Sequence, residues 1–544
     1  MRKNVKKQLA LRVLSTAALM AMVSSIATAA FADTYDLNKG SVTVETKENG
    51  ITYVTQLDNT QKDGYARNDK DDILHDYQDK TGVTITSYGK QTENTITVDT
   101  AKDQTTDVTL KDVHIETEGS WNNTGSAPIE IKGDGDTNLE LNGDNTVLSG
   151  DRHHAAIEKA DKNGTGTLTI KDDLNDDNST PKDKDENGNA VGGDTGKLLA
   201  GGYGDGAGIG GGYNDITDLS YANTSNITIK GGEITARGGC EDGAGIGGGT
   251  YGNAKNIRIE GNAHVTALAK SGAGIGGGTG GGNSITITDN AVVNARSYFD
   301  AAIGGGDDAG RYNSPNTITI SGNATVTAES DESSAIGDGR YGNASDLTIN
   351  IEKNANVTAI SSYDCPAIGT PRSIDATTTT INITGGTVNA INSIGSDYRP
   401  DDGTGDTSPA IGAVIAANRG ATCNVNINSS TGDTVVNAYI YGKGSGTAIG
   451  STIRNYNDIT HEEEYQYVPA DSVSYKADGS SHFGERNSAI VNCYNNATVE
   501  KHWLDNLPTI KDTNTVAYFD YSHTIKGGTL TKVVHNRKYM EENP

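Results

Sequence analysis

Short runs of alternating apolar and polar residues recur along most of the chain. Such alternation places every second side chain on one face of an extended strand, so each run predicts a half-buried β-strand. Most runs are followed by a Gly or Asn turn and a second short run, such as Glu233–Ala236 or Thr325–Ala328. The opening runs are Ile227–Ile229, Ile257–Ile259, Ile285–Ile287, Ile318–Ile320, Leu347–Ile349, Ile381–Ile383 and Val425–Ile427.

A glycine-rich segment completes each unit and predicts a third short strand. Gly-Ala-Gly-Ile-Gly-Gly-Gly occurs at 206–212, 243–249 and 272–278 and shortens to Ala-Ile-Gly further on. Three short strands in about thirty residues cannot bury their apolar faces within one unit, but stacked units can. We therefore expect an all-β fold, a right-handed parallel β-helix with a shared interior. The isoleucines expected to line it are Ile209, Ile246, Ile275, Ile303, Ile336, Ile368, Ile411 and Ile449.

The glycine-rich segment also fits the dinucleotide pattern G-x-G-x-x-G. That motif should occur once and should open a helix after a single strand. Here the segment recurs and no helical pattern follows it, so a nucleotide cofactor is not expected. A calcium β-roll is excluded as well, since its glycines would return every nine residues.

The N-terminal segment predicts export. Residues 1–32 carry five bases, then an apolar run over 13–26, and end in Ala30-Phe31-Ala32. This order is typical of a signal peptide, here cleaved after Ala32, and the apolar run is too short to span a bilayer. We expect a secreted or cell-surface protein whose mature form does not span a membrane.

The mature chain is expected to have three parts. The repeats occupy residues 94–452, and residues 33–93 and 453–544 lose them. Because open solenoid ends expose unpaired backbone, we expect an N-terminal cap at 33–93. Residues 453–544 are expected to form a C-terminal cap or an accessory β module.

Charge and cysteine content narrow the classes of partner. Lys and Arg number 44 against 71 Asp and Glu, a formal net charge of −27, so a nucleic-acid partner is not expected. The four cysteines contain no close pair, which argues against a zinc site and a disulfide framework. We expect a monomer.

One ordered set of segments carries a family resemblance. These segments are Asp107–Ile115, Ala127–Ile131, Asn138–Thr146, Ala155–Ile157 and Thr167–Ile170, followed by the glycine-rich series. In this order they resemble secreted bacterial carbohydrate-binding domain-containing proteins, which are similar in fold to pectate-lyase-type β-helices. The resemblance covers about residues 100–450 and implies polysaccharide binding, with calcium in some members. The long insert at 171–196 departs from the family pattern.

Tyrosines indicate where a glycan would bind. Tyr is the dominant aromatic residue, 24 against four Phe and two Trp. Several tyrosines follow the glycine-rich segment, and one phenol per coil would form a strip whose rings stack on sugar faces. The alternative is that these rings only cover loops. The glycan-binding candidates are Tyr213, Tyr251, Tyr312 and Tyr341.

The insert contains a pattern that is typical of a calcium loop. Oxygen ligands stand at positions 1, 3 and 5, Gly188 at position 6 and a carboxylate at position 12. Asp replaces the usual Glu at position 12, and no flanking helices are expected, so a solvated acidic loop is the alternative. The calcium-binding candidates are Asp183, Asp185, Asn187, Asn189 and Asp194.

A second acidic series is periodic. In six of eight units an acidic residue precedes the repeat isoleucine by three to five positions. Such residues form turns by local hydrogen bonds or, alternatively, form a row that binds calcium or glycans. They are Asp205, Asp242, Asp300, Asp331 with Glu332, Asp364 and Asp406.

No catalytic constellation stands out, and we assign no catalytic residues. Isolated bases such as Arg258, Lys270 and Arg340 have no supporting groups, and spacing cannot select a carboxylate pair in so acidic a chain. The sequence favours a non-catalytic polysaccharide-recognition or adhesion protein. The alternatives are a calcium-dependent polysaccharide lyase or hydrolase of the same fold, and a structural stalk or adhesin that binds a host protein.

Overall fold

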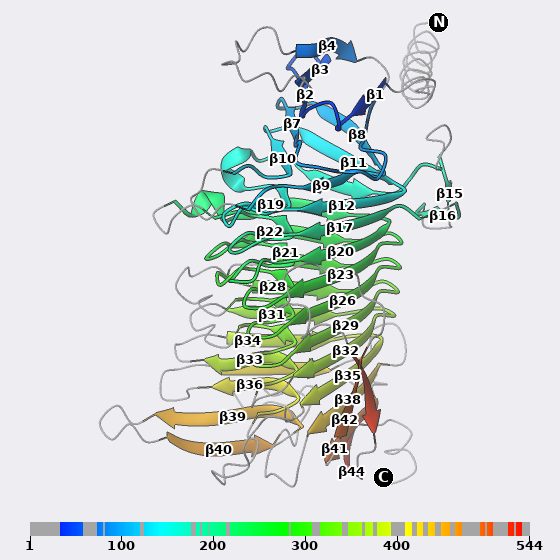
Figure 1. Ribbon diagram of the computed structural model, residues 1–544. Coiled ribbons are helices and arrows are strands. Elements are labelled where there is room, and N and C mark those ends of the chain that lie inside the picture. Colours follow the sequence, from blue (N-terminus) through cyan, green and yellow to red (C-terminus); the bar gives the residue numbers. More distant parts are fainter. Residues whose placement is uncertain are drawn as a thin grey trace, which may run out of the picture.

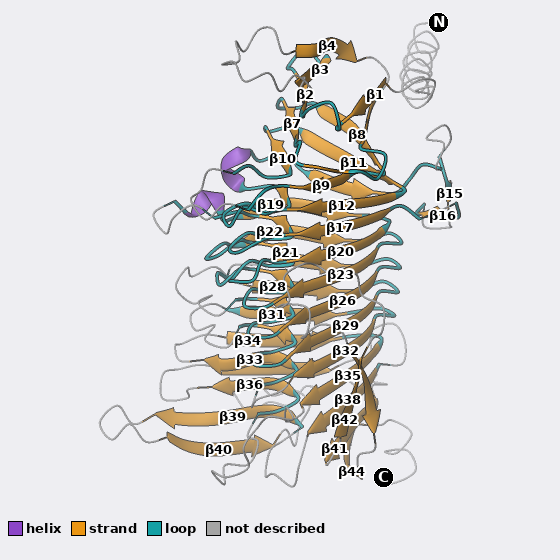
Figure 2. Ribbon diagram, in the orientation of Figure 1, coloured by secondary structure: helices purple, strands orange, loops and turns teal. Residues whose placement is uncertain are grey.

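The computed structural model is a parallel β-helix (Figures 1 and 2). Within its described residues no helix has the length and apolar character needed to cross a membrane. The structure describes residues 33–57, 73–79, 82–119, 125–175, 181–184, 188–193, 195–213, 218–281, 284–306, 316–339, 346–361, 365–373, 378–392, 408–415, 422–427, 434–440, 448–456, 463–469, 490–495, 498–503, 521–526 and 529–535.

Three long sheets, here called A, B and C, run along the solenoid. In each full coil the chain passes through sheet A, then sheet C, then sheet B, and returns to sheet A one layer further on. The described N-terminal and C-terminal strands therefore lie at opposite ends of the stack (Figure 1). This order matches the three-strand unit that the sequence predicted.

Sheets A and C form two of the faces. Sheet A contains, in order, β1 (Asp33–Asp36), β5 (Val83–Thr86), β8 (Thr105–Lys111), β11 (Asp136–Asn142), β14 (Leu168–Lys171), β19 (Thr224–Ile229), β22 (Ala254–Ile259), β25 (Ser284–Ile287), β28 (Asn316–Ile320), β31 (Leu347–Ile351), β34 (Thr378–Ile383) and β37 (Thr422–Ile427). Sheet C contains β6 (Gln91–Thr92), β9 (His114–Glu116), β12 (Asp144–Leu148), β17 (Lys197–Gly201), β20 (Glu233–Arg237), β23 (His264–Ala269), β26 (Val292–Ser297), β29 (Thr325–Ser330), β32 (Asn356–Ser361), β35 (Thr387–Asn392), β38 (Val435–Ile440), β41 (Ile490–Asn495) and β44 (Thr529–His535).

Sheet B is narrow along its middle, where each strand has two residues. Its strands are β4 (Ile73–Asp79), β3 (Thr52–Leu57), β2 (Val42–Thr46), β7 (Ile96–Thr100), β10 (Ile129–Lys132), β13 (Ile157–Glu158), β18 (Ile209–Gly210), β21 (Ile246–Gly247), β24 (Ile275–Gly276), β27 (Ile303–Gly304), β30 (Ile336–Gly337), β33 (Ile368–Ser373), β36 (Ile411–Ile415), β39 (Ile449–Tyr456) and β40 (Glu463–Pro469). Outside the three sheets lie the hairpins β15 (Asp183–Lys184) with β16 (Ala190–Val191) and β42 (Thr498–Trp503) with β43 (Tyr521–Lys526), and the short 3-10 helices η1 (Asp161–Asn163) and η2 (Leu219–Tyr221).

Identical residues stack from coil to coil and form the core. The eight repeat isoleucines pair in one unbroken register along sheet B and are all buried, as the sequence predicted. Sheet C carries a parallel ladder of alanines from Ala200 to Ala438. Like residues in register fill the interior at each layer, so one repeated pattern specifies the whole core.

The coils extend past both boundaries expected from the repeat pattern. Residues 33–93 contain β1 and β5 of sheet A and β2 of sheet B, which pair in parallel with the strands of the next coil. At the other end β41 still pairs in parallel with β38. The antiparallel strands β3, β4, β40 and β44 complete the ends of sheets B and C. The repeat motif fades in these coils because their core residues differ. Among the described residues the first coil has no strand in sheet C, and the last has none in sheet A.

One glycine of each glycine-rich segment holds a conformation that other residues avoid. From Gly210 to Gly450, the glycine after the repeat isoleucine has φ between +138° and +148°. A Cβ atom on Gly276 would also overlap the carbonyl oxygen of Gly304 in the next coil, and the same holds for Gly210, Gly247, Gly304, Gly337, Gly369 and Gly412 with their successors. We call these residues the glycine column. Backbone therefore rests directly on backbone here, which only glycine permits.

We expect Gly276→Ala to lower the free energy of unfolding by about 4 kcal/mol, because it combines backbone strain with overpacking. Urea denaturation followed by circular dichroism measures the loss. Gly89→Ala is the matched control, since Gly89 has φ +69° but open space around its Cβ position. Equal losses in the two variants would contradict direct backbone stacking as the cause.

A carboxyl group is buried in the first unit in which only one glycine follows the repeat isoleucine. Asp338 follows Gly337 and is 2% exposed. Its carboxylate accepts hydrogen bonds from Asn316 Nδ2 at 2.6 Å and from Thr370 Oγ1 at 3.1 Å. Burial raises the pKa of Asp338 to about 7, and these two hydrogen bonds only partly offset the effect.

The raised pKa of Asp338 predicts a loss of stability as the pH rises. The folded state holds this proton up to about pH 7, whereas the unfolded chain releases it near its ordinary value of 3.8. The stabilisation from the protonated carboxyl group is therefore complete below pH 3.8, falls progressively as the pH rises, and is fully lost once the pH has passed about 7. Asp338→Asn should equal the wild type near pH 4 and exceed it by up to about 4 kcal/mol near pH 8. Urea melts at both pH values measure the difference. The exposed Asp144→Asn is the control, and a constant difference between Asp338→Asn and wild type would refute the prediction.

Candidate functional site

Three aromatic rings from different turns form a row beside sheet B. The centroids of His153 and Tyr213 lie 5.4 Å apart, and those of Tyr213 and Tyr251 lie 6.5 Å apart. All three side chains are half-buried. We call His153, Tyr213 and Tyr251 the aromatic row. The structure thus brings together two of the four predicted tyrosines, and Tyr312 and Tyr341 lie outside the described residues.

The turns on either side of sheet B position these rings. The strands of sheet B are only two residues long here. The turn before sheet B in one coil therefore lies close to the turn after sheet B in the next coil. The Tyr213 N–H donates to the carbonyl oxygen of His153 at 2.6 Å. The Tyr251 N–H donates to Thr279 Oγ1 at 3.0 Å, one coil further on. Backbone contacts between coils therefore fix both ring positions.

A salt bridge connects the turns before sheet B in two successive coils. Arg152 Nε donates to Asp205 Oδ2 at 2.8 Å, with the Arg152 side chain 35% exposed and the Asp205 side chain 5% exposed. Asp205 also accepts from Thr250 Oγ1 at 3.0 Å, beside Tyr251. The carboxylate is thus hydrogen-bonded from two coils, and the Arg152 side chain remains partly exposed to solvent.

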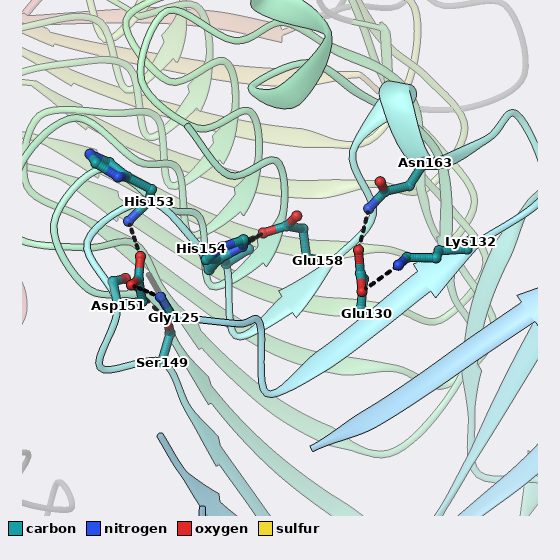
Figure 3. A network of polar contacts seen from close by, with 10 residues as sticks. Gly125, Glu130, Lys132, Ser149, Asp151, His153, His154, Glu158 and Asn163 are labelled. Carbon is teal, nitrogen blue, oxygen red and sulfur yellow. Dashed lines mark hydrogen bonds and ion pairs between the residues drawn. The ribbon is translucent and has the colours of Figure 1, made fainter. Parts of the chain in front are cut away.

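His154 and Glu158 form a second polar pair next to the aromatic row. Figure 3 shows the two side chains directed at each other, with His154 Nδ1 2.7 Å from Glu158 Oε2. Glu158 is buried, and Oε2 also accepts from the Ala155 N–H at 3.3 Å. In the same turn Asp151 is buried and accepts from the backbone N–H groups of His153 and Gly125.

The environment of His154 favours its protonated form. Burial lowers the pKa of His154, but the hydrogen bond to Glu158 and the negative charges of Glu158, Asp151 and Glu130 together raise it above its ordinary value. Glu130 lies one coil earlier and binds Lys132 at 2.8 Å and Asn163 at 3.3 Å (Figure 3). The turn that holds His153 thus also carries a histidine biased towards its charged form and a guanidinium group.

Sequence patterns did not single out Arg152, His153, His154 or Glu158. The available signal was their position directly before and after Ala155-Ala156-Ile157, where the corresponding segment of later coils is nearly all glycine and alanine. Three consecutive large polar side chains at that position are a departure from the repeat. Such a departure indicates that this turn has a role beyond connecting two strands.

The predicted calcium loop forms a small hairpin. Asp183 pairs with Val191, and Lys184 pairs with Ala190 in antiparallel register. The side chain of Asp183 is exposed and that of Asn189 is half-buried. Asp185, Asn187 and Asp194 lie outside the described residues. The part of the chain that is described contains no cluster of three or more His, Cys, Asp or Glu side chains suited to a metal, so calcium binding stays a prediction.

The periodic acidic residues mostly lie in buried turns. Asp205, Asp300 and Asp331 are buried. Asp331 accepts from Arg296 Nη2 at 2.9 Å, within sheet C and its following turn. Asp364 and Asp406 lie outside the described residues. The carboxylates of Asp205 and Asp331 bind basic side chains of a neighbouring coil, so both roles of the acidic series, turn formation and ligand binding, stay predictions.

The comparisons with known proteins agree with this architecture. A family model described as a beta helix repeat matches residues 227–250, 318–340 and 381–413. No curated protein and no solved structure matches the chain. Each matched segment contains a strand of sheet A, a strand of sheet C and a strand of sheet B. They identify the repeats of this chain as β-helix repeats.

We expect Glu158→Gln to lower the pKa of His154. Glutamine keeps the size and a hydrogen-bond acceptor but removes the charge, so that burial becomes the dominant influence. A proton–nitrogen NMR titration of the imidazole signals measures this pKa. Glu352→Gln, in a distant coil, is the control and should leave the titration of His154 unchanged. An unchanged His154 titration in Glu158→Gln would show that the pair is not formed in solution.

Proposed function

We propose that this chain is an exported, non-catalytic carbohydrate-binding β-helix protein that recognises polysaccharides at the cell surface or outside the cell. The observation that carries the proposal is the aromatic row, in which rings from successive coils follow the long axis of the solenoid. Phenol rings combine apolar faces with a hydroxyl group that stays hydrated, which suits the faces and edges of sugars.

The polar groups around the aromatic row support the same function. Arg152 and the protonated His154 offer hydrogen-bond donors, and Asp205 holds Arg152 in place. Donors fixed before a ligand arrives lower the entropy cost of binding.

Export belongs to the proposal and depends on the first 32 residues. Cleavage after Ala32 would make Asp33, the first residue of β1, the new N-terminus. The mature chain would then begin with a strand of sheet A. Calcium, if it binds the insert, would be a structural ion of the hairpin loop.

We expect the double substitution Tyr213→Ala and Tyr251→Ala to weaken glycan binding about thirtyfold, since each ring contributes on the order of 1 kcal/mol beyond its buried area. A glycan array, run with and without calcium, identifies the ligand, and calorimetry with that glycan measures the loss. Tyr88→Ala is the control, because Tyr88 is 64% exposed and lies in a different turn. Unchanged affinity of the double variant would reject the aromatic row as the site.

The same experiments separate the two other functions. Release of unsaturated products or new reducing ends from pectin-type polymers would assign a lyase or hydrolase, and the His154–Glu158 pair is the feature that favours this candidate. The absence of binding to any glycan on the array, together with capture of a host protein, would instead assign a structural stalk or adhesin.

A further inference from the structure

The insert at 171–196 is fastened at its base by a buried pair of charged side chains. Lys182 Nζ lies 2.7 Å from Asp172 Oδ2, and the two side chains are 3% and 6% exposed. Asp172 directly follows β14 of sheet A, and Lys182 directly precedes β15 of the hairpin that projects from the stack (Figure 1). Backbone contacts hold the two segments together, since the Lys182 N–H donates to the carbonyl oxygen of Asp173 at 2.8 Å.

Burial makes the charged form of this pair costly. Removing a carboxylate and an ammonium group from water costs several kcal/mol for each ion, and their attraction offsets this only partly. Burial raises the pKa of Asp172, against the hydrogen bond and charge of Lys182 and the hydrogen bond from Gly196. The carboxyl group is therefore displaced towards its neutral acid form, and the amine that lies against it is the nucleophile of the pair.

Neighbouring groups favour attack of the amine on the carboxyl carbon. The Gly196 N–H donates to Asp172 Oδ2 at 3.2 Å, so it stabilises the negative charge that develops on this oxygen. Glu140 is a buried acid near Asp172, and burial raises its pKa to about 7. One of its oxygens accepts from the Leu174 N–H at 2.7 Å, which places this proton-exchanging group at the base of the same insert. Lys171 and Asp173 are the other charged groups there.

We propose that Lys182 and Asp172 form an intramolecular isopeptide bond. The Nζ–Cγ bond forms and the Cγ–Oδ1 bond breaks, while Oδ2 remains as the amide oxygen on the Gly196 N–H. The ammonium and carboxylate groups together become one amide and one water molecule, so charge and atoms balance without an oxidant or a cofactor. Two groups held in contact in a dry site react as an effectively unimolecular pair.

The bond would close a ring from residue 172 to residue 182. It would fix the start of the insert to sheet A and restrict the unfolded chain in the way that a disulfide does. Cys240, Cys365 and Cys423 form no disulfide within the part of the chain that the structure describes, so none of these three supplies such a link. The inference is independent of the proposed carbohydrate binding.

Mass spectrometry of the purified full chain tests the bond directly. The intact mass should be lower than that of the linear sequence by one water molecule. Trypsin should not cut after Lys182, so digestion should give the peptide 172–184, one water lighter than its sequence. An intact mass equal to that of the linear chain, with a normal peptide 172–182, would overturn the proposal.

Two substitutions locate the bond. Lys182→Arg keeps the positive charge but has no amine that forms this amide, so it should restore the linear mass and the peptide 172–182. Lys184→Arg is the matched control in the adjoining hairpin and should keep the light peptide. A water loss that persists in Lys182→Arg would place the modification elsewhere and would equally overturn the assignment.

Discussion

Direct contact of backbone on backbone along the glycine column is the constraint on which the rest of this structure depends. Because no side chain fits between Gly276 and Gly304 or their equivalents, sheet B narrows to two residues per strand. The chain then closes tightly around the repeat isoleucine, with the Ala244 N–H donating to the carbonyl oxygen of Gly248 at 2.9 Å. Close stacking of the coils thus requires two things together, a buried isoleucine inside and glycine, which has no side chain, on the outside.

The short strands of sheet B also limit where functional side chains can lie. Strands in the narrow region present almost no side chains on sheet B, so functional groups must come from the turns beside it. Those turns meet across successive coils, as the Thr250 N–H bond to the carbonyl oxygen of Asp205 at 3.0 Å shows. A ligand site on such a solenoid is therefore assembled from neighbouring coils, and its spacing along the axis follows the layer spacing.

The repeated part of the fold could be predicted from the sequence, and the site only in part. The register of the isoleucines follows from their period, because stacking like on like is the only arrangement that buries every copy. The contact between Arg152 and Asp205 joins residues 53 positions apart. Asp205 belongs to the periodic acidic series, but Arg152 has no counterpart in the later coils, so periodicity does not predict the contact. Tyr213 and Tyr251 were found because they follow the repeated segment, whereas His153, which completes their row, precedes a weaker copy. The pairing of Lys182 with Asp172 was hidden for the same reason, inside an insert with no counterpart in other coils.

A buried polar side chain stands two residues after the inward isoleucine at each end of the narrow region. At the N-terminal end it is Lys159, in a coil without the column glycine, and at the C-terminal end it is Asp338, which follows Gly337. Lys159 is 1% exposed, donates from Nζ to the carbonyl oxygen of Gly164 at 2.8 Å, and has its pKa lowered by burial. A side chain can enter there only because the adjoining coil no longer has the same tight turn. The candidate site lies beside the first of these borders for the same physical reason, since only at a border do turn side chains face a coil whose turns differ from their own.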